Sequence, residues 1–326
     1  MPSLPEIVGH EKQCGQLLAD IAHGNVSQAY LFTGPKHIGK FTIARWFAFR
    51  LLLDDAGPAA QAIIRDQVER LIHPDLLSLD TLWIEGVQED WGTISETSNI
   101  PQQHRSKNPT AKTDVIGIDE IRLLHDRLMA TGSSSHLCCL IRSVERMPPA
   151  TANAFLKILE EPPPRVVFIL TAESSRALLP TVVSRTRVMR FHPLTTTEMR
   201  PLLKNQDDED EAFALHLAEG APGTLLSLLR NPEALRASKQ LHAQTKQFWQ
   251  ARSAHERLNW IMPFADQKTN MTDLLRHLGA TLREHPDHVR KVAWTAAYID
   301  LAEALKSNAH RGLLLERFTL AVTKES

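Results

Sequence analysis

The sequence predicts an α/β fold with a parallel sheet over about the first 193 residues, followed by an all-helical remainder. Up to that point, short apolar stretches alternate with segments of helical periodicity. This alternation is typical of crossover units, in which helices cover both faces of a parallel sheet. After about Pro193 no further strand pattern is found, and apolar residues such as Leu274, Leu278 and Leu282 recur at helical spacing.

The expected strands are short apolar runs bounded by turn residues. The first of them stops at a Gly-Pro pair, which is typical of a strand that leads into a loop. We expect strands over 29–33, 76–83, 136–141 and 166–171, and helices over 41–53, 118–129 and 150–161. Residues 90–114 are polar and rich in Ser, Asn, Gln and Pro, so this stretch is interpreted as a mobile surface insertion.

The composition excludes several classes of protein. The 326 residues include 37 Lys and Arg against 38 Asp and Glu, and the net charge of −1 excludes a strongly basic nucleic-acid coat. The three cysteines, Cys14, Cys138 and Cys139, form neither a disulfide framework nor a zinc site. The N-terminus lacks the features of a signal peptide, and no apolar run approaches the ~18 residues of a membrane span. We therefore expect a cytoplasmic protein without membrane contact.

A phosphate-binding loop is predicted over residues 34–42, with the sequence G-P-K-H-I-G-K-F-T. The segment follows a predicted strand and opens a predicted helix, which is the context that the P-loop pattern G-x-x-x-x-G-K-[ST] requires. Gly34, Pro35 and Gly39 supply a loop whose N–H groups can cradle phosphate oxygens. Lys40 is in place to meet the terminal phosphates, and the helix dipole adds positive potential.

The residues that would hold Mg²⁺ are missing from this predicted site. Phe41 stands where the loop pattern has Ser or Thr, and Thr42 lies one residue later, about 100° round the helix. The strand over 136–141 is followed by Arg142 where hydrolysis needs a carboxylate for the metal. Glu145 comes two or three residues later and is interpreted as the start of the next turn. Autonomous ATP hydrolysis is therefore not expected, while weak binding of ATP or ADP and a loop without ligand both stay open.

Several segments, taken in order, resemble one protein family. They are I-V-G-H at 7–10, A-Y-L-F at 29–32, H-P-D at 73–75, N-A-F-L-K-I-L-E-E-P-P at 153–163, S-R-T at 184–186 and G-A-P-G at 220–223. Together they resemble the delta-prime subunit of the bacterial DNA polymerase III clamp loader, an AAA+ family. The resemblance covers roughly residues 4–230, and the eleven-residue segment is its most specific part.

The resemblance implies an architecture and a set of partners. It implies a P-loop AAA+ domain over 1–193, a small helical lid over 194–232 and a C-terminal helical oligomerisation (collar) domain over 233–326. The partners would be gamma/tau and delta clamp-loader subunits, the sliding clamp and, through the assembled complex, primer-template DNA. The family's zinc module is absent, because residues 54–72 contain no cysteine; this segment is expected to be a plain helical connection. No metal and no cofactor is required.

The resemblance also assigns a role to Arg185, the arginine of the S-R-T segment. In the family this arginine reaches the ATP site of a neighbouring subunit. A planar guanidinium beside the γ-phosphate stabilises the charge that develops in phosphoryl transfer. The expected function is therefore that of a non-hydrolysing, stator-like subunit that supplies Arg185 in trans. The alternative is an ATP-hydrolysing subunit of the gamma/tau type.

Overall fold

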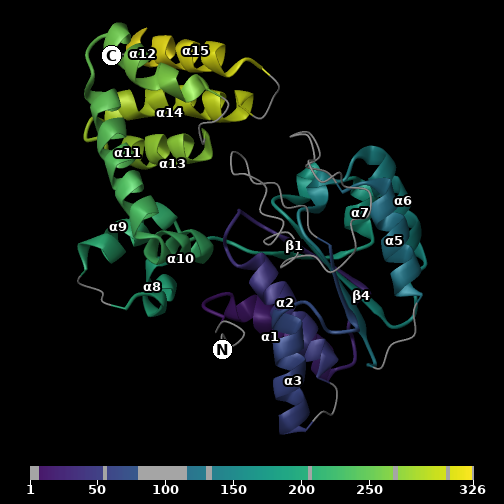
Figure 1. Ribbon diagram of the computed structural model, residues 1–326. Coiled ribbons are helices and arrows are strands. Elements are labelled where there is room, and N and C mark those ends of the chain that lie inside the picture. Colours follow the sequence, from purple (N-terminus) through teal and green to yellow (C-terminus); the bar gives the residue numbers. More distant parts are fainter. Residues whose placement is uncertain are drawn as a thin grey trace. The chain divides into compact units, whose positions relative to one another are not determined.

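The computed structural model describes residues 7–53, 57–79, 116–129, 134–204, 208–266, 271–305 and 309–324. These residues form two compact units (Figure 1). The first holds the described residues up to Lys204 together with 219–224, and the second holds 208–218 and the described residues from Leu225 on. The predicted insertion at 90–114 lies outside the described residues, and the division into three domains stays a prediction.

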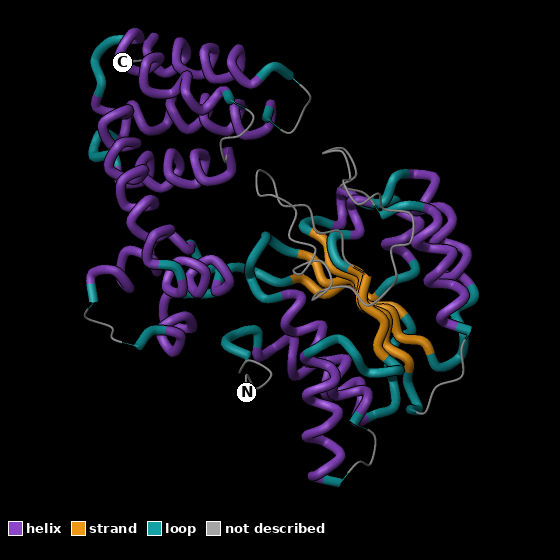
Figure 2. Tube along the Cα trace, in the orientation of Figure 1, coloured by secondary structure: helices purple, strands orange, loops and turns teal. Residues whose placement is uncertain are grey.

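The first unit is built on a parallel sheet of five strands in the order β2-β3-β4-β1-β5 (Figure 2). Every neighbouring pair in this order is parallel. The strands are β1 (Ala29–Thr33), β2 (Leu76–Leu79), β3 (Leu137–Ile141), β4 (Val166–Ala172) and β5 (Arg187–Arg190). Strands β1 to β4, which include the edge strand β2, are buried along their whole length, as expected for a sheet covered on both faces.

Helices cover the two faces of this sheet and form two separate cores. Figure 1 shows α1, α2 and α3 on one side and α5, α6 and α7 on the other. The helices of this unit are α1 (Glu11–Ala22), α2 (Lys40–Leu52), α3 (Pro58–Glu69), α5 (Ile118–Leu128), α6 (Pro149–Glu160), α7 (Pro180–Ser184) and α8 (Thr196–Met199), with 3₁₀ turns at Val144–Arg146, Ser175–Ala177 and Arg200–Leu202. Cys138 and Cys139 lie in opposite cores, so both act as small apolar residues.

The sequence predicts the three inner strands well and misses one of the two edge strands, β5. The other edge strand, β2, is expected over 76–83 and is described as Leu76–Leu79. Strands β1, β3 and β4 and helices α2, α5 and α6 lie within about a residue of the predicted bounds. β5 escapes prediction because it carries arginine at both ends and buries only Met189, so it has no apolar run. Its backbone pairs with β1 alone. The connection predicted over 54–72 contains the helix α3 (Pro58–Glu69).

A closed polar network stands at the amino ends of β2, β3 and β4. The carboxylate of Asp75, with an exposed fraction of 1%, accepts hydrogen bonds from the backbone N–H of Ser134 at 3.0 Å and from its hydroxyl at 2.9 Å. The guanidinium of Arg165 lies 3.3 Å from the other carboxylate oxygen of Asp75 and donates to the carbonyl of Ser134. The H-P-D segment therefore joins three strands at this end of the sheet.

The described part of the second unit is helical throughout. Its helices are α9 (Glu209–Ala218), α10 (Pro222–Arg230, which begins in the first unit), α11 (Pro232–Gln250), α12 (Ala254–Ile261), α13 (Met271–Glu284), α14 (His288–Ala304) and α15 (Arg311–Lys324), with a 3₁₀ turn at Met262–Ala265. The rings of Trp249 and Trp294 stack at 5.2 Å in its core. Arg257 is 1% exposed and donates to the carbonyls of Phe248 and Ala251 and the hydroxyl of Thr323, so its charge is solvated by the protein.

Among the helices that the structure describes, none combines the length and the apolar character that crossing a membrane requires.

Candidate functional site

The predicted phosphate loop connects the carboxyl end of β1 to the N-terminus of α2. Gly34 has a φ of 152°, and a Cβ there would lie 2.3 Å from the carbonyl oxygen of Phe191, so no side chain fits. Gly39 caps α2 with a φ of 95°, in the left-handed region that favours glycine. A Cβ at Gly39 would meet no atom within 4 Å, so this side of the loop is open. The loop therefore has the backbone that a phosphate site needs.

Two motif segments from elsewhere in the first unit fix the conformation of this loop. The ring Nε2 of His10, which is buried, lies 2.9 Å from the carbonyl oxygen of Ile38 and donates to it. The backbone N–H of Gly223 donates to the carbonyl of His37 at 2.8 Å, and a Cβ at Gly223 would lie 2.9 Å from that oxygen. The I-V-G-H and G-A-P-G segments thus both contact the loop.

The side chain of Lys40 folds back onto the loop. Its ammonium donates to the carbonyl oxygens of Gly34 and Pro35, both at 2.6 Å. Burial lowers the pKa of Lys40 to about 8, while the nearby carboxylates of Glu173 and Glu145 raise it and the charge of Arg142 lowers it. An anion bound at this ammonium would favour the protonated form.

Phe41 and Arg142, which stand at the sequence positions of the expected metal ligands, contact each other beside the loop. The guanidinium carbon of Arg142 lies 4.5 Å from the centroid of the Phe41 ring, in a cation–π contact. An aromatic ring offers no oxygen ligand, and a guanidinium repels a dication. Arg142 also acts on the charge state of Lys40, so it belongs to the same site. The residues present fit the phosphates of a nucleotide but do not fit Mg²⁺.

Glu145 belongs to the site, whereas the sequence pattern indicates only a turn. Ser143 adopts a left-handed conformation with a φ of 52°, so the chain turns sharply after β3. The carboxylate of Glu145 accepts from the backbone N–H of Glu173 at 3.3 Å and raises the pKa of Lys40. Burial, together with the charge of Glu173, raises the pKa of Glu145 itself. The spacing of residues in the sequence does not predict that Glu145 lies near Lys40, because the left-handed turn at Ser143 brings it there.

Arg185 ends α7 and is held at the surface. Its guanidinium pairs with the carboxylate of Glu160 at 2.6 Å and donates to the carbonyl of Thr181 at 3.1 Å. The side chain keeps an exposed fraction of 35%. Glu160 belongs to the eleven-residue segment on α6, so this ion pair joins two of the motifs that carry the resemblance.

The parallel register separates Arg185 from the loop of its own chain. Arg187 pairs with Tyr30 near the start of β1, and Gly34 follows the end of β1. Arg185 therefore lies at the amino end of the sheet, whereas the loop lies at the carboxyl end. At about 3.3 Å per residue, the four residues from Tyr30 to Gly34 put the start of β5 roughly 13 Å from the level of the loop, beyond the reach of an arginine side chain.

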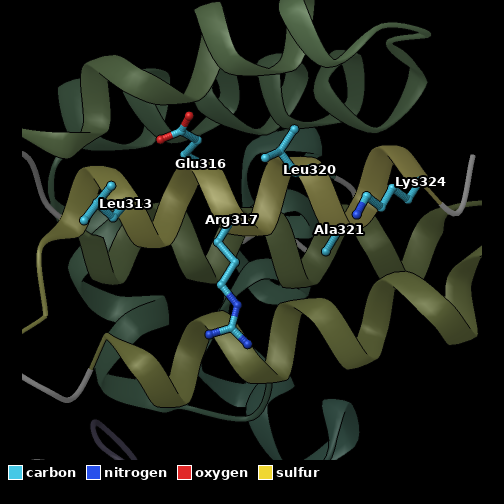
Figure 3. A pocket seen from close by; sticks show the side chains of 6 residues that line it. All are labelled: Leu313, Glu316, Arg317, Leu320, Ala321 and Lys324. Carbon is cyan, nitrogen blue, oxygen red and sulfur yellow. The ribbon is translucent and has the colours of Figure 1, made fainter.

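A groove in the second unit runs along α15 and contains none of the predicted site residues. Figure 3 shows its lining side chains, which are Leu313, Glu316, Arg317, Leu320, Ala321 and Lys324. Leu313 is 64% exposed and Leu320 is 44% exposed, so the helix carries apolar surface there. Within the described ranges, no group of three or more His, Cys, Asp or Glu side chains is arranged to hold a metal ion.

The sequence matches a known protein family over more than half of its length. Residues 9–195 match the family described as DNA polymerase III, delta subunit. The chain belongs to this family. The resemblance to clamp-loader subunits that the motifs indicate is thereby confirmed at the level of the family.

Curated relatives of this family member include subunits of two kinds. The DNA polymerase III subunit gamma/tau of Mycobacterium bovis is 29% identical over 236 residues, which are 70% of this chain and 36% of that protein. The DNA polymerase III subunit delta' of Bacillus subtilis is 28% identical over 194 residues, 59% of this chain and 50% of that protein. The chain thus spans about a third of its gamma/tau relative and half of its delta' relative.

A solved structure confirms the fold. The DNA polymerase III gamma subunit-related protein of Thermotoga maritima superposes with a TM-score of 0.52 at 18% identity, covering 95% of this chain and 98% of that one. The predicted fold class, a parallel sheet with helices on both faces followed by a helical C-terminal part, is therefore correct. In this chain, the predicted loop at 34–42 and Arg185 lie at opposite ends of the parallel sheet.

Proposed function

We propose that this family member is a non-hydrolysing, delta-prime-like subunit of the clamp loader, which helps to load the sliding clamp onto primed DNA. The contact between Phe41 and Arg142 carries this proposal. Hydrolysis needs a metal ion bound next to the γ-phosphate, and these two residues replace the expected metal ligands. Both replacements touch each other, so restoring one residue alone would leave the other in the way.

The position of Arg185 supports a role in a neighbouring subunit. It lies at the end of the sheet away from its own loop, so its guanidinium cannot serve the same chain. Its acidic partner Glu160 is half-exposed, and such a pair is worth at most about 1 kcal/mol. A neighbour's triphosphate, with several negative charges, would compete effectively for this guanidinium.

We extend the proposal to the partners. Gamma/tau and delta subunits would assemble with this chain through its C-terminal helical domain, where α15 exposes Leu313 and Leu320. The sliding clamp and primer-template DNA would be reached through the assembled complex, to which each subunit need contribute only a few phosphate contacts. A net charge of −1 is compatible with a subunit that contributes only a few contacts to DNA phosphates. The cytoplasm is the expected location.

A hydrolysing, gamma/tau-like subunit is the second candidate. It is favoured by the relative of that kind, which matches 236 residues, against 194 for the delta' relative of Bacillus subtilis. This candidate requires the chain to bind Mg²⁺-ATP at the loop of residues 34–42, where Phe41 and Arg142 stand.

Steady-state ATPase measurements separate the two candidates. The purified chain should show no turnover above background with Mg²⁺-ATP, and ready turnover would overturn the proposal. Mixed with gamma/tau and delta subunits, it should co-purify as one complex whose ATPase exceeds that of the gamma/tau subunits alone. Failure to co-assemble would overturn the proposal as well.

A further inference from the structure

We propose that the loop at 34–42 is a metal-independent site for the phosphates of a nucleotide, with Arg142 supplying the positive charge that Mg²⁺ supplies elsewhere. This inference rests on the proposed function in one respect, since both take the metal position as lost. It goes further, because it assigns to Phe41 and Arg142 a part in binding the phosphates of a nucleotide. The P-loop pattern implies Mg²⁺ beside the phosphates, but Phe41 and Arg142 do not fit this ion. The inference starts from this disagreement.

The Phe41 ring holds the guanidinium of Arg142 in place. The guanidinium carbon lies 4.5 Å above the ring, and Arg45 approaches the same ring at 5.8 Å. Phe41 is the second residue of α2, directly after the loop lysine. A guanidinium stacked there stands beside the phosphate cradle and presents a planar set of N–H donors, which suit phosphate oxygens.

The charges around the loop favour an anion over a dication. Lys36, Lys40 and Arg142 face two carboxylates, those of Glu145 and Glu173. The charge of the Glu173 carboxylate is balanced by Lys36, with which it pairs at 3.2 Å. The other, Glu145, accepts a backbone N–H and is disfavoured as an anion by burial. A phosphate chain therefore adds negative charge next to an excess of cations, whereas Mg²⁺ would add two positive charges there.

The loop itself is shaped for phosphates. Its glycines keep the backbone conformation that turns N–H groups inward, and the space beside Gly39 is open. Lys40 donates to two carbonyl oxygens of the loop, which phosphate oxygens would replace as acceptors. The ligand is thus a nucleoside diphosphate or triphosphate, bound through its phosphate chain.

Equilibrium titration of the full chain with ADP, in EDTA and in excess Mg²⁺, tests this inference. We expect ADP to bind as tightly in EDTA as in Mg²⁺, or more tightly. Arg142→Ala should weaken binding about tenfold or more, the value of a lost charge-assisted hydrogen bond. The matched control is Arg50→Ala, which removes an exposed arginine at the far end of α2 and should leave the affinity unchanged.

A double variant provides the converse test. Phe41→Ser with Arg142→Asp restores both metal ligands of the P-loop pattern, so Mg²⁺ should now strengthen ADP binding. Titration with inorganic pyrophosphate shows whether the phosphates alone suffice; it should bind more weakly than ADP but with the same insensitivity to Mg²⁺.

Three results would overturn the inference. They are the absence of ADP binding under both conditions, stronger binding of ADP to the unaltered chain in Mg²⁺ than in EDTA, and an unchanged affinity in Arg142→Ala whose fold is intact by circular dichroism. None of them touches the ATPase and co-assembly tests of the proposed function. Conversely, turnover of Mg²⁺-ATP by the isolated chain would overturn the proposed function by a separate measurement.

Discussion

The two ends of one parallel sheet differ in what their polar residues do. At the carboxyl end, the loop, Arg142 and two glutamates form an open cluster of charges around Lys40. At the amino end, Asp75 is fully enclosed and shares its carboxylate among Ser134 and Arg165, while Arg185 stays at the surface. The open cluster can still take a ligand, the enclosed network joins strands, and the surface arginine is available to another molecule.

This difference teaches how a site can lose one chemistry without loss of the fold. The carboxyl ends of parallel strands are where α/β proteins bind ligands, and few packing constraints act on the residues there. Phe41 and Arg142 therefore replace metal ligands and contact each other without disturbing the sheet. A change at Asp75 has no such freedom, because the carboxylate is buried among strand ends.

The largest effect is expected at Arg185. Arg185→Ala should lower the ATPase of a complex reconstituted with gamma/tau and delta subunits about a thousandfold, the lower end of the range for a trans-acting arginine. Arg185→Lys keeps the charge but not the planar fork and should recover part of the rate. Glu160→Ala, which removes the acidic partner of this guanidinium, serves as the control and should retain activity. An unchanged ATPase in Arg185→Ala would contradict the assignment of the amino end to a neighbour's site.

Asp75 should have the largest effect on stability. Asp75→Ala leaves Arg165 and the N–H of Ser134 without their buried acceptor, and it should lower the free energy of unfolding of the first unit by about 3 kcal/mol. Urea unfolding followed by circular dichroism measures this loss. The matched control is Asp66→Ala, which breaks an exposed pair with Arg70 and should cost less than about 1 kcal/mol. Equal effects of the two substitutions would mean that enclosure of the network does not matter.

Acid is expected to destabilise the second unit through His277. The stability of the first unit should therefore be measured near neutral pH. Burial, with smaller effects of His242 and Arg276, lowers the pKa of His277 to about 4, so the folded state favours the neutral ring. Burial lowers the pKa of His242 as well; the neighbouring Glu284 raises it, whereas Lys246 and His216 lower it. Above about pH 6.5 the ring is neutral in both states and does not reduce the free energy of unfolding. As the pH falls toward 4 the unfolded chain takes up the proton first, and the free energy of unfolding falls by about 2–3 kcal/mol.

Unfolding of His277→Gln by urea at pH 7 and at pH 4.5 checks this loss. The variant should show a smaller change in stability with pH than the unaltered chain. His255→Gln, at an exposed position, should behave like the unaltered chain. A full pH effect in His277→Gln would assign it to other groups.

The smallest effect concerns Lys40 at the open end of the sheet. Since its pKa is about 8 without ligand, raising the pH from 7 to 9 removes most of its positive charge. ADP affinity should therefore fall about fivefold to tenfold over this range, with uptake of a proton on binding at the higher pH. Lys40→Arg stays charged throughout and corrects for the titration of ADP itself. A loss of affinity of the same size in Lys40→Arg would exclude the lysine as its cause.

The candidate site could be predicted only where the chain is continuous. Gly34, Gly39 and Lys40 follow one another along a strand, loop and helix whose periodicity is plain, so their place was predictable. Glu145 was not, because a left-handed turn at Ser143 brings it back toward the loop. The edge strand β5 was missed since β1 supplies its hydrogen-bond partners while its own residues lack an apolar run.

The sequence by itself determined the inner strands with the helices α2, α5 and α6, the phosphate-loop pattern and the two replaced metal ligands, because apolar periodicity and short motifs act locally. Only the tertiary structure decided that Phe41 and Arg142 touch, that Glu160 holds Arg185, and that Arg185 and the loop lie at opposite ends of the sheet. These facts depend on strand register and on contacts between residues far apart in the chain, and no local pattern records them.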